Sequence, residues 1–280
     1  MSFQMRWLGT ACFEIVLPNH RSIITDPYVD DSVSAPITSD QFEGCDYIFI
    51  THGHYDHVLD VGTLANRFSP KIFCSDVTAR SLIEHQGVDP ALISRVTAGD
   101  VIQEEGLSVE VVRGVHLDFA REYERLTGRH LADGTNKRMS TVKQFIKETL
   151  DTDWLPKQFR DWTAKYPQGE QLNFVFAPAD GKRIYMAGSC PEPSLIEVAQ
   201  RAKAYITLLQ VLPGNSLRGL EEQTARIAIA SGCKIVVPQH YDPLLRGAKE
   251  TDLSELKRIL DEKSDIIFQE FAHGEWYQFD

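Results

Sequence analysis

One short segment of the chain concentrates side chains that bind metals. Residues 51–57 read Thr-His-Gly-His-Tyr-Asp-His and directly follow a hydrophobic run. Imidazole nitrogens suit zinc and other first-row metals, and alternate residues at a strand end point the same way. His52 and His54 are therefore predicted to share one metal, while Asp56 and His57 are predicted to bind a second metal beside it. The alternative is a chance cluster of surface histidines, which is disfavoured because protonated imidazoles packed this closely repel one another.

Short runs of β-branched and aromatic residues predict the strands that carry this segment. The first half is expected to open as a meander, with strands at 4–8, 11–16, 22–25 and 46–50. Later strands are predicted at 107–112, 174–176, 183–186, 205–209, 234–237, 266–268 and 275–279.

Helices are predicted where capping residues flank an apolar stripe. One spans 76–86, with Asp76 as its N-cap and Gly87 behind it. Another spans 194–201 and is opened by a capping box of Ser194 and Glu197; two more are predicted at 220–231 and 252–261. Strands interleaved with helices in a chain of 280 residues favour an α/β protein with two sheets covered by helices.

Residues 117–171 differ in character from the rest of the chain. They include a polar, charged stretch at 121–138 and amphipathic helical patterns at 141–150 and 155–166. Because no repeat, low-complexity tract or linker marks a second unit, we interpret residues 1–280 as one domain. Residues 117–171 are predicted to form a helical insertion near the active site.

The histidine segment resembles the His-x-His-x-Asp-His signature of the metallo-β-lactamase superfamily without a gap. Residues 6–13 (RWLGTACF) and 24–27 (ITDP) resemble the N-terminal strands of the branch that contains ascorbate-6-phosphate lactonase and N-acyl-phosphatidylethanolamine phospholipase D. Residues 238–241 (PQHY) resemble the final ligand segment of that branch. The resemblance implies an αββα sandwich with the metals at the edge of the two sheets.

The same resemblance implies further ligands. His116, after the predicted strand 107–112, is the histidine available as third ligand of the first metal, and His240 would close the second site. Each has the alternative role of an ordinary loop or turn histidine. Where many members carry a bridging Asp, this chain has Gly188-Ser189-Cys190. Cys190 is then a candidate thiolate ligand, and the alternative is an ordinary buried cysteine.

Two residues are candidates to orient the ligands. Asp26, after the strand 22–25, is predicted to accept a hydrogen bond from a ligating histidine, and Thr51 is predicted to do the same from the strand end. The alternative for Asp26 is a turn-forming residue before Pro27. His20, His85, His130 and His273 have no partner in the sequence pattern and are not predicted to be ligands.

The predicted function is a metal-dependent hydrolase that uses a metal-bound hydroxide, with Asp56 orienting the hydroxide or accepting a proton. The cofactor is expected to be zinc, as one or two ions, with manganese and iron as alternatives. The resemblance favours an ester, lactone or phosphoester of a small molecule, in the manner of a lactonase. Two alternatives stay open. One is a di-iron oxidoreductase, against which the missing Asp at Ser189 counts, and the other is a noncatalytic metal-binding protein.

The insertion is a candidate for selecting the substrate. Lys137 and Arg138, with Arg125 and Arg129 nearby, are positioned in the sequence to hold an anionic group over the metals. Trp154 and Trp162 are candidates for an apolar wall. The alternative is that these charges form a solvated helix face.

Composition excludes several other classes. The chain has 29 Lys and Arg against 40 Asp and Glu, a net charge of −11, which opposes binding to nucleic acids. No apolar run approaches the roughly 20 residues of a membrane span, and the N-terminus lacks a signal-peptide pattern, so a cytoplasmic location is expected. The five cysteines are expected to be reduced thiols. Whether the chain forms a homo-oligomer stays open.

Overall fold

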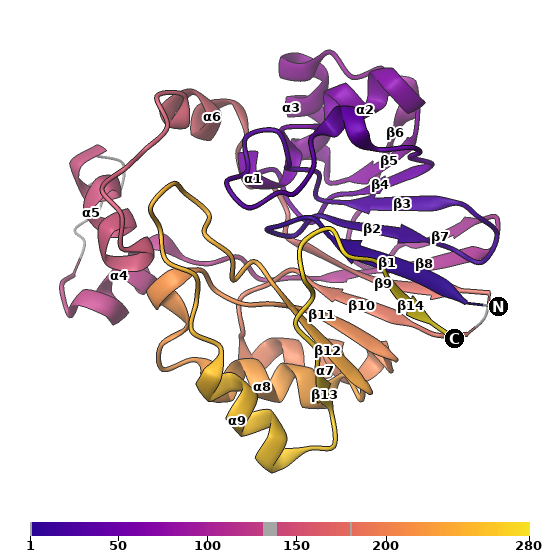
Figure 1. The fold of residues 1–280 in the computed structure, drawn as a ribbon. Coiled ribbons are helices and arrows are strands. Elements are labelled where there is room, and N and C mark those ends of the chain that lie inside the picture. The colour runs from indigo at the N-terminus through magenta and orange to yellow at the C-terminus, as the bar shows by residue number, and fades with distance from the viewer. Residues whose placement is uncertain (1, 131–138, 180) are drawn as a thin grey trace.

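The computed structural model describes residues 2–130, 139–179 and 181–280. In these residues two seven-stranded sheets lie face to face, with helices on the outer surface of each sheet (Figure 1). This arrangement is the four-layered αββα sandwich predicted from the sequence.

The first sheet has the strand order β14-β1-β2-β3-β4-β5-β6. Strands β1, β2 and β3 pair antiparallel with one another in this order, whereas the neighbouring strands from β3 to β6 run parallel. The predicted meander is therefore correct only as far as β3, because a crossover of about twenty residues brings β4 back parallel to it. The strands are β1 (Phe3–Trp7), β2 (Phe13–Val16), β3 (Ser22–Thr25), β4 (Tyr47–Phe49), β5 (Lys71–Cys74), β6 (Ile93–Arg95) and β14 (Tyr277–Phe279).

The second sheet has the order β13-β12-β11-β10-β9-β8-β7. Strands β7 to β10 pair antiparallel, and β10 to β13 run parallel. The strands are β7 (Val101–Glu104), β8 (Leu107–Arg113), β9 (Leu172–Pro178), β10 (Ile184–Ala187), β11 (Ile206–Gln210), β12 (Ile235–Gln239) and β13 (Ile267–Phe268).

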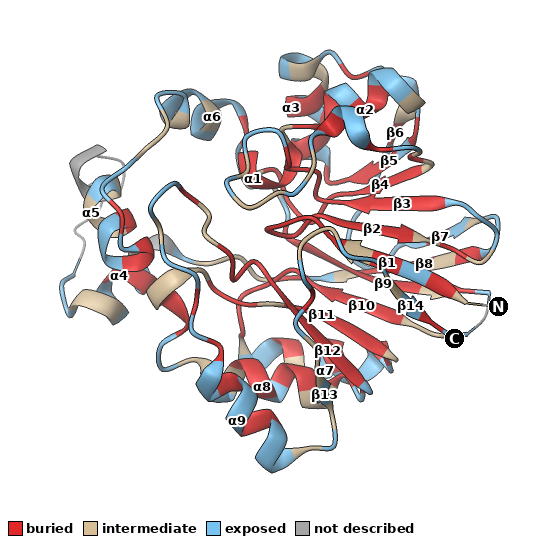
Figure 2. Cartoon of the chain, in the orientation of Figure 1, coloured by how far each residue is buried: buried red, intermediate tan, exposed pale blue. Residues whose placement is uncertain are grey.

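The central strands are buried on both faces, as parallel strands covered by helices must be. In β4 and the residue after it, Tyr47 and Phe49 belong to the core between the sheets, while Ile48 and Ile50 belong to the core beneath the helices. The ring of Phe49 lies 4.7 Å from that of Phe73 and contacts two phenylalanine rings of the second sheet. Figure 2 shows this buried layer between the sheets. These contacts fix β4, and with it the position of the histidine segment that follows.

The outer helices are α2 (Val61–Phe68) and α3 (Asp76–Gln86) on the first sheet, and α7 (Ile196–Ala202), α8 (Glu221–Ala230) and α9 (Ser254–Lys263) on the second (Figure 1). Two predicted caps differ. The N-cap of α3 is Ser75, whose hydroxyl accepts the Thr78 N–H, so Asp76 is the first helical residue. The predicted capping box at Ser194 is absent, because Pro193 opens a 3-10 turn that already contains Ser194 and α7 begins after it.

Residues 117–171 lie between the neighbouring strands β8 and β9 and contain α4 (Phe119–Thr127), α5 (Met139–Leu150) and α6 (Phe159–Lys165). The predicted charged stretch thus holds α4 in its first half, and part of the rest falls outside the described residues. The Arg125 side chain bonds the carbonyl oxygens of Ser216 and Arg218. Gly214 approaches the Thr149 carbonyl so closely that a Cβ there would overlap it. These contacts attach α4 and α5 to the loop that follows β11.

Several short elements were not predicted from the sequence, namely the four-residue helix α1 (Tyr55–Val58), α2, β5, β6 and β7. All five cysteines are buried and free of disulfides, as expected. Within the described residues, no helix combines the length and hydrophobicity needed to cross a lipid bilayer.

Candidate metal centre

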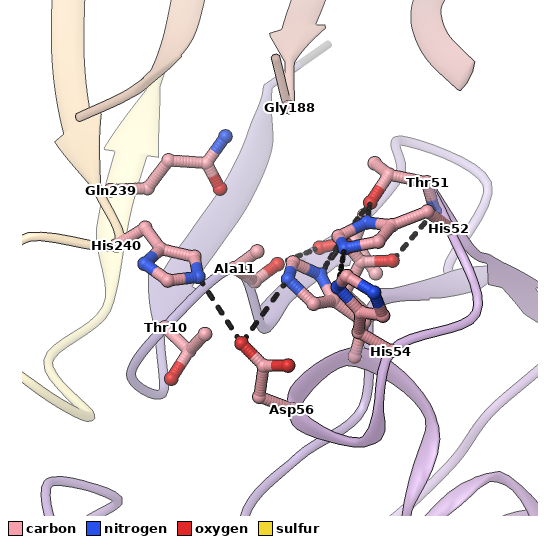
Figure 3. Close-up of polar contacts among 12 residues, drawn as sticks. Thr10, Ala11, Thr51, His52, His54, Asp56, Gly188, Gln239 and His240 are labelled. Atoms are coloured by element: carbon pink, nitrogen blue, oxygen red, sulfur yellow. Dashed lines mark hydrogen bonds and ion pairs between the residues drawn. The ribbon is translucent and has the colours of Figure 1, made fainter. Parts of the chain in front are cut away.

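Six predicted ligand residues meet at one end of the two sheets. The segment His52 to His57 follows β4 of the first sheet, whereas His116 follows β8 and His240 follows β12 of the second. Figure 3 shows the side chains from both sheets converging. They form two groups, His52 with His54 and His116, and Asp56 with His57 and His240, in each of which the ligand atoms lie within 4.8 Å of one another. The two groups adjoin, because the rings of His52 and His57 are 4.0 Å apart.

In the first group, hydrogen bonds select which ring nitrogen faces the centre. The Nδ1 of His116 donates to the carbonyl oxygen of Leu117 at 2.9 Å, which leaves its Nε2 free. The Nδ1 of His52 lies 3.1 Å from the Thr51 hydroxyl, and its Nε2 lies 3.1 Å from the Nδ1 of His54. Three imidazole nitrogens therefore face one point, as in the three-protein-ligand zinc sites of enzymes.

In the second group, a carboxylate lies between two imidazoles. The Oδ2 of Asp56 is 3.6 Å from the Nε2 of His57 and 3.4 Å from the Nε2 of His240. Figure 3 shows the contact between Asp56 and His240. The group therefore offers one hard oxygen and two imidazole nitrogens to a cation.

The buried carboxyl group of Asp26 forms hydrogen bonds that orient the candidate ligands. Asp26 is fully buried; its Oδ2 accepts from the Nδ1 of His57 at 2.8 Å and from the Thr51 hydroxyl at 2.7 Å. Its Oδ1 accepts the Thr51 N–H. Thr51 in turn accepts from His52, so one carboxyl group orients a histidine of each group. The predicted contacts of Asp26 and Thr51 with the candidate ligands are confirmed.

Burial and mutual repulsion keep the first group of imidazoles neutral. Burial, with the neighbouring histidines, lowers the pKa of His52 well below its usual value and lowers the pKa of His54 to about 3. Burial likewise lowers the pKa of His116. Neutral imidazoles keep the lone pairs that a metal requires. The three imidazoles are therefore unprotonated at neutral pH and available to bind a cation.

The carboxylate changes this balance in the second group. Burial on its own would raise the pKa of Asp56, but His57, His240 and His54 outweigh it, and the pKa is lowered. Burial opposes protonation of His57, yet Asp26 and Asp56 together raise its pKa. The second group is therefore a negative carboxylate surrounded by imidazoles, a suitable setting for a divalent cation.

His240 occupies an unfavourable backbone conformation. Its φ of 65° is in the left-handed region, which costs a non-glycine residue on the order of 1 kcal/mol or more. The N–H of His240 donates to the carbonyl oxygen of Thr10, and the N–H of Thr10 donates to both carboxylate oxygens of Asp242. This chain of bonds turns the imidazole of His240 toward Asp56.

Close packing requires a glycine at position 53 of the histidine segment. A Cβ on Gly53 would lie 2.3 Å from the carbonyl oxygen of Pro167. The Gly53 N–H also donates to the carbonyl oxygen of Gln168 at 2.8 Å. Only glycine lets the loop before β9 cover the segment this closely, and this contact links residues 117–171 to the candidate ligands.

Cys190 lies near the centre but outside both groups of ligand atoms. Burial, with Glu122 and Glu192 nearby, raises the pKa of its thiol to about 12. The neighbouring Ser189 hydroxyl donates to Asn173 and accepts the N–H of Val115, so it is occupied by structural bonds. The role of Cys190 as a ligand stays a prediction.

The two groups form the floor of a large cavity with a volume of about 1040 Å³. All six candidate ligands and Cys190 line it, together with apolar residues of α5, α6 and the loops after β11 and β12. Sequence reasoning missed this apolar wall, whose members Val142, Phe145, Ile146, Leu150, Leu212, Leu244 and Leu245 come from three separate segments.

Of the residues predicted to hold an anion, Arg125 and Arg129 are described, and neither lines this cavity. The Arg125 guanidinium bonds Glu122 and backbone carbonyls, and Arg129 and Trp154 are exposed. Trp162 stacks on Tyr55, which lines the cavity, with the ring centroids 5.1 Å apart. Lys137 and Arg138 lie outside the described residues. Of the histidines not predicted to be ligands, His20, His85 and His130 are exposed, and His273 stacks on Trp7.

Comparison with known proteins agrees with this geometry. Residues 6–120 match the family model of the metallo-β-lactamase superfamily. The fold resembles Igni18, a metallo hydrolase from Ignicoccus hospitalis, with a TM-score of 0.70 and 16% identity over 100% of this chain and 99% of that one. It also resembles an isothiocyanate hydrolase from Delia radicum gut bacteria, with a TM-score of 0.64 and 18% identity over 99% of both chains. The match over residues 6–120 makes this part of the chain similar to the metallo-β-lactamase superfamily, and the fold resemblance extends over the whole chain.

The chain is also similar to proteins named UPF0173 metal-dependent hydrolases. It is 31% identical to one from Metallosphaera sedula over 47% of this chain and 57% of that protein. It is 26% identical to one from Myxococcus xanthus over 91% of this chain and 77% of that protein. A third, from Koribacter versatilis, is 31% identical over 40% of this chain and 47% of its own length. The chain thus spans about half the length of the first and third of these relatives.

Proposed function

We propose that the protein is a metal-dependent hydrolase that cleaves an ester, lactone or phosphoester bond of a small molecule, and that its own residues would hold two adjacent cations beside that bond. The observation that carries the proposal is the pair of ligand groups on the floor of one cavity, each with ligand atoms within 4.8 Å of one another. The names of the similar proteins support the same reaction class.

The donor sets fit two cations. His52, His54 and His116 would hold the first with three nitrogens, and Asp56, His57 and His240 would hold the second with two nitrogens and an oxygen. Zinc is the metal we propose for so imidazole-rich a set. When bound, such a cation lowers the pKa of water from 15.7 toward about 7 and polarises the bond under attack.

The chain itself supplies orientation and proton transfer. Asp26 and Thr51 hold the rings of His57 and His52 in position, and Asp56 is proposed to orient the attacking water and accept its proton. Residues 117–171 are proposed to act as an insertion that encloses the substrate, since α5 and α6 line the cavity above this floor.

The alternatives have less support. A di-iron oxidoreductase needs carboxylates around both metals, whereas the first group among the described residues is three imidazoles and Asp56 is the only carboxylate in the second. A purely structural metal site would be closed by protein ligands, whereas both groups open into the cavity.

The proposal is tested by metal analysis and hydrolysis of p-nitrophenyl acetate and bis(p-nitrophenyl) phosphate. His54→Ala is expected to lose bound metal and activity together, because it removes one of three nitrogens of the first group. His20→Ala is the matched control, since His20 is an exposed histidine that does not line the cavity. Normal turnover by His54→Ala, or equal loss in both variants, contradicts the proposal.

A further inference from the structure

The wall of the cavity opposite the candidate ligands is apolar. Ile146, Leu150 and Leu245 are buried in one small cluster, and Val142, Phe145 and Leu244 pack against it, partly buried. All six line the cavity. Because such side chains are normally covered in a folded protein, a continuous apolar wall in an accessible cavity indicates an apolar ligand.

The charges around the cavity point the same way. Among the described residues that line it, Arg160 is the one Lys or Arg, and its side chain is exposed. Two carboxylates, Asp56 and Asp118, also line it. Because Asp56 is a candidate metal ligand, the described lining away from the metal centre carries one acidic and one basic side chain, and these charges do not favour an anionic substrate.

Two hydrogen bonds attach the wall to the loops that follow the strands of the second sheet. Asn215 donates to the carbonyl oxygen of Glu148 at 3.0 Å, and the Thr152 hydroxyl donates to that of Arg246 at 3.0 Å. These bonds join α5 and its C-terminal end to the loops after β11 and β12. A cavity of about 1040 Å³ between this wall and the metal centre is large for a small polar metabolite and is of the size that encloses drug-sized ligands.

Resting on the hydrolase function proposed above, we propose that the substrate carries a neutral alkyl or acyl chain beside its scissile bond. The chain lies against Val142, Phe145 and Leu244 while the scissile bond lies at the candidate ligands. This inference names the substrate class and differs from the anion-binding role predicted from the sequence.

The first experiment compares p-nitrophenyl acetate, butyrate, octanoate and decanoate as substrates of the zinc-loaded full chain. Each methylene that is buried on the wall should raise kcat/KM by up to about fourfold, until the cavity is filled. A mono-p-nitrophenyl succinate serves as the anionic competitor. A flat series, or a succinate ester preferred over the octanoate, overturns the inference while leaving the hydrolase function intact.

The second experiment places a charge in the wall. Val142→Asp and Val142→Arg should both lower the ratio of decanoate to acetate kcat/KM, about tenfold or more, because either charge is poorly solvated against an alkyl chain. Val77→Asp is the matched control, since Val77 is exposed on α3 and does not line the cavity. A ratio of succinate to acetate kcat/KM that is lowered by Val142→Asp but raised by Val142→Arg would show that the wall receives a negative group and would overturn the inference.

Binding separates this inference from the hydrolase function. Calorimetry with 1-decanol and 1-butanol needs no turnover, so it decides the matter even if none of the esters is cleaved. Decanol is expected to bind more tightly than butanol by more than tenfold, and less tightly to both Val142 variants. Equal affinities for the two alcohols overturn the inference, whereas uncleaved esters with strong decanol binding contradict only the hydrolase function.

Discussion

The floor and the wall of the cavity are built in different ways. In the floor, buried polar side chains are tied to one another, with Asp26 bonding Thr51 and His57 and with His240 held by a carbonyl oxygen in a left-handed conformation. In the wall, leucine, isoleucine, valine and phenylalanine side chains of α5 and two loops form an apolar cluster. Directional bonds fix geometry to a fraction of an ångström, whereas apolar contacts accept many shapes. The difference suggests that the floor sets the reaction and the wall sets the substrate.

Beside the floor in the chain, Asp60 is a further buried carboxyl group, whose Oδ2 accepts the N–H groups of Val29 and Asp30, so the stability of the fold should vary with pH. Burial raises the pKa of Asp60 to about 7, with the charge of Asp30 adding to the effect and the Val29 N–H opposing it. The folded chain therefore keeps this proton up to about pH 7, whereas the unfolded chain releases it near the usual value of 3.8. Stability must fall as pH rises between these values.

Asp60→Asn should remove that dependence. Between pH 4 and pH 8, the wild type should lose about 2 to 4 kcal/mol more of its unfolding free energy than the variant does. Urea unfolding at both pH values measures the difference. Asp31→Asn, at an exposed neighbouring position, should follow the wild type. If the unfolding free energies of all three chains change equally between the two pH values, Asp60 does not cause the pH dependence.

Weakening the hydrogen bond between Asp26 and His57 should lower the metal affinity more than the stability of the fold. Asp26→Asn keeps the shape of the side chain but weakens its bond to the Nδ1 of His57, so metal affinity should fall about 10- to 100-fold. Competition with a chromophoric chelator measures it, with Asp31→Asn as the control. An unchanged affinity would mean that Asp26 forms a turn and does not support the ligand.

The smallest effect is expected in the wall. Ile146→Val removes one buried methyl group from the cluster between α5 and the loop after β12, and should cost about 1 kcal/mol of unfolding free energy. Metal content should stay at the wild-type level, because none of the candidate ligands belongs to this cluster. Loss of metal in this variant would show that floor and wall are coupled.

The floor was largely predictable from the sequence, and the wall was not. His52, His54, Asp56 and His57 are adjacent in the chain, so one strand end brings them together, and Asp26 follows a neighbouring strand of the same sheet. The wall combines α5 with residues 212 and 244–245, which no local pattern connects. Periodicity showed that 141–150 is amphipathic but not which surface its apolar face covers. Arg125 shows the same limit, because its partners lie about ninety residues away.

The five buried cysteines have a consequence for how motion in this protein can be followed. Because burial raises the pKa of each thiol, none of them reacts readily while the fold is closed. A bulky thiol reagent therefore reports the frequency of opening at five places in the sandwich. Cys190, which alone among them lines the cavity, reports separately on whether the cavity is filled.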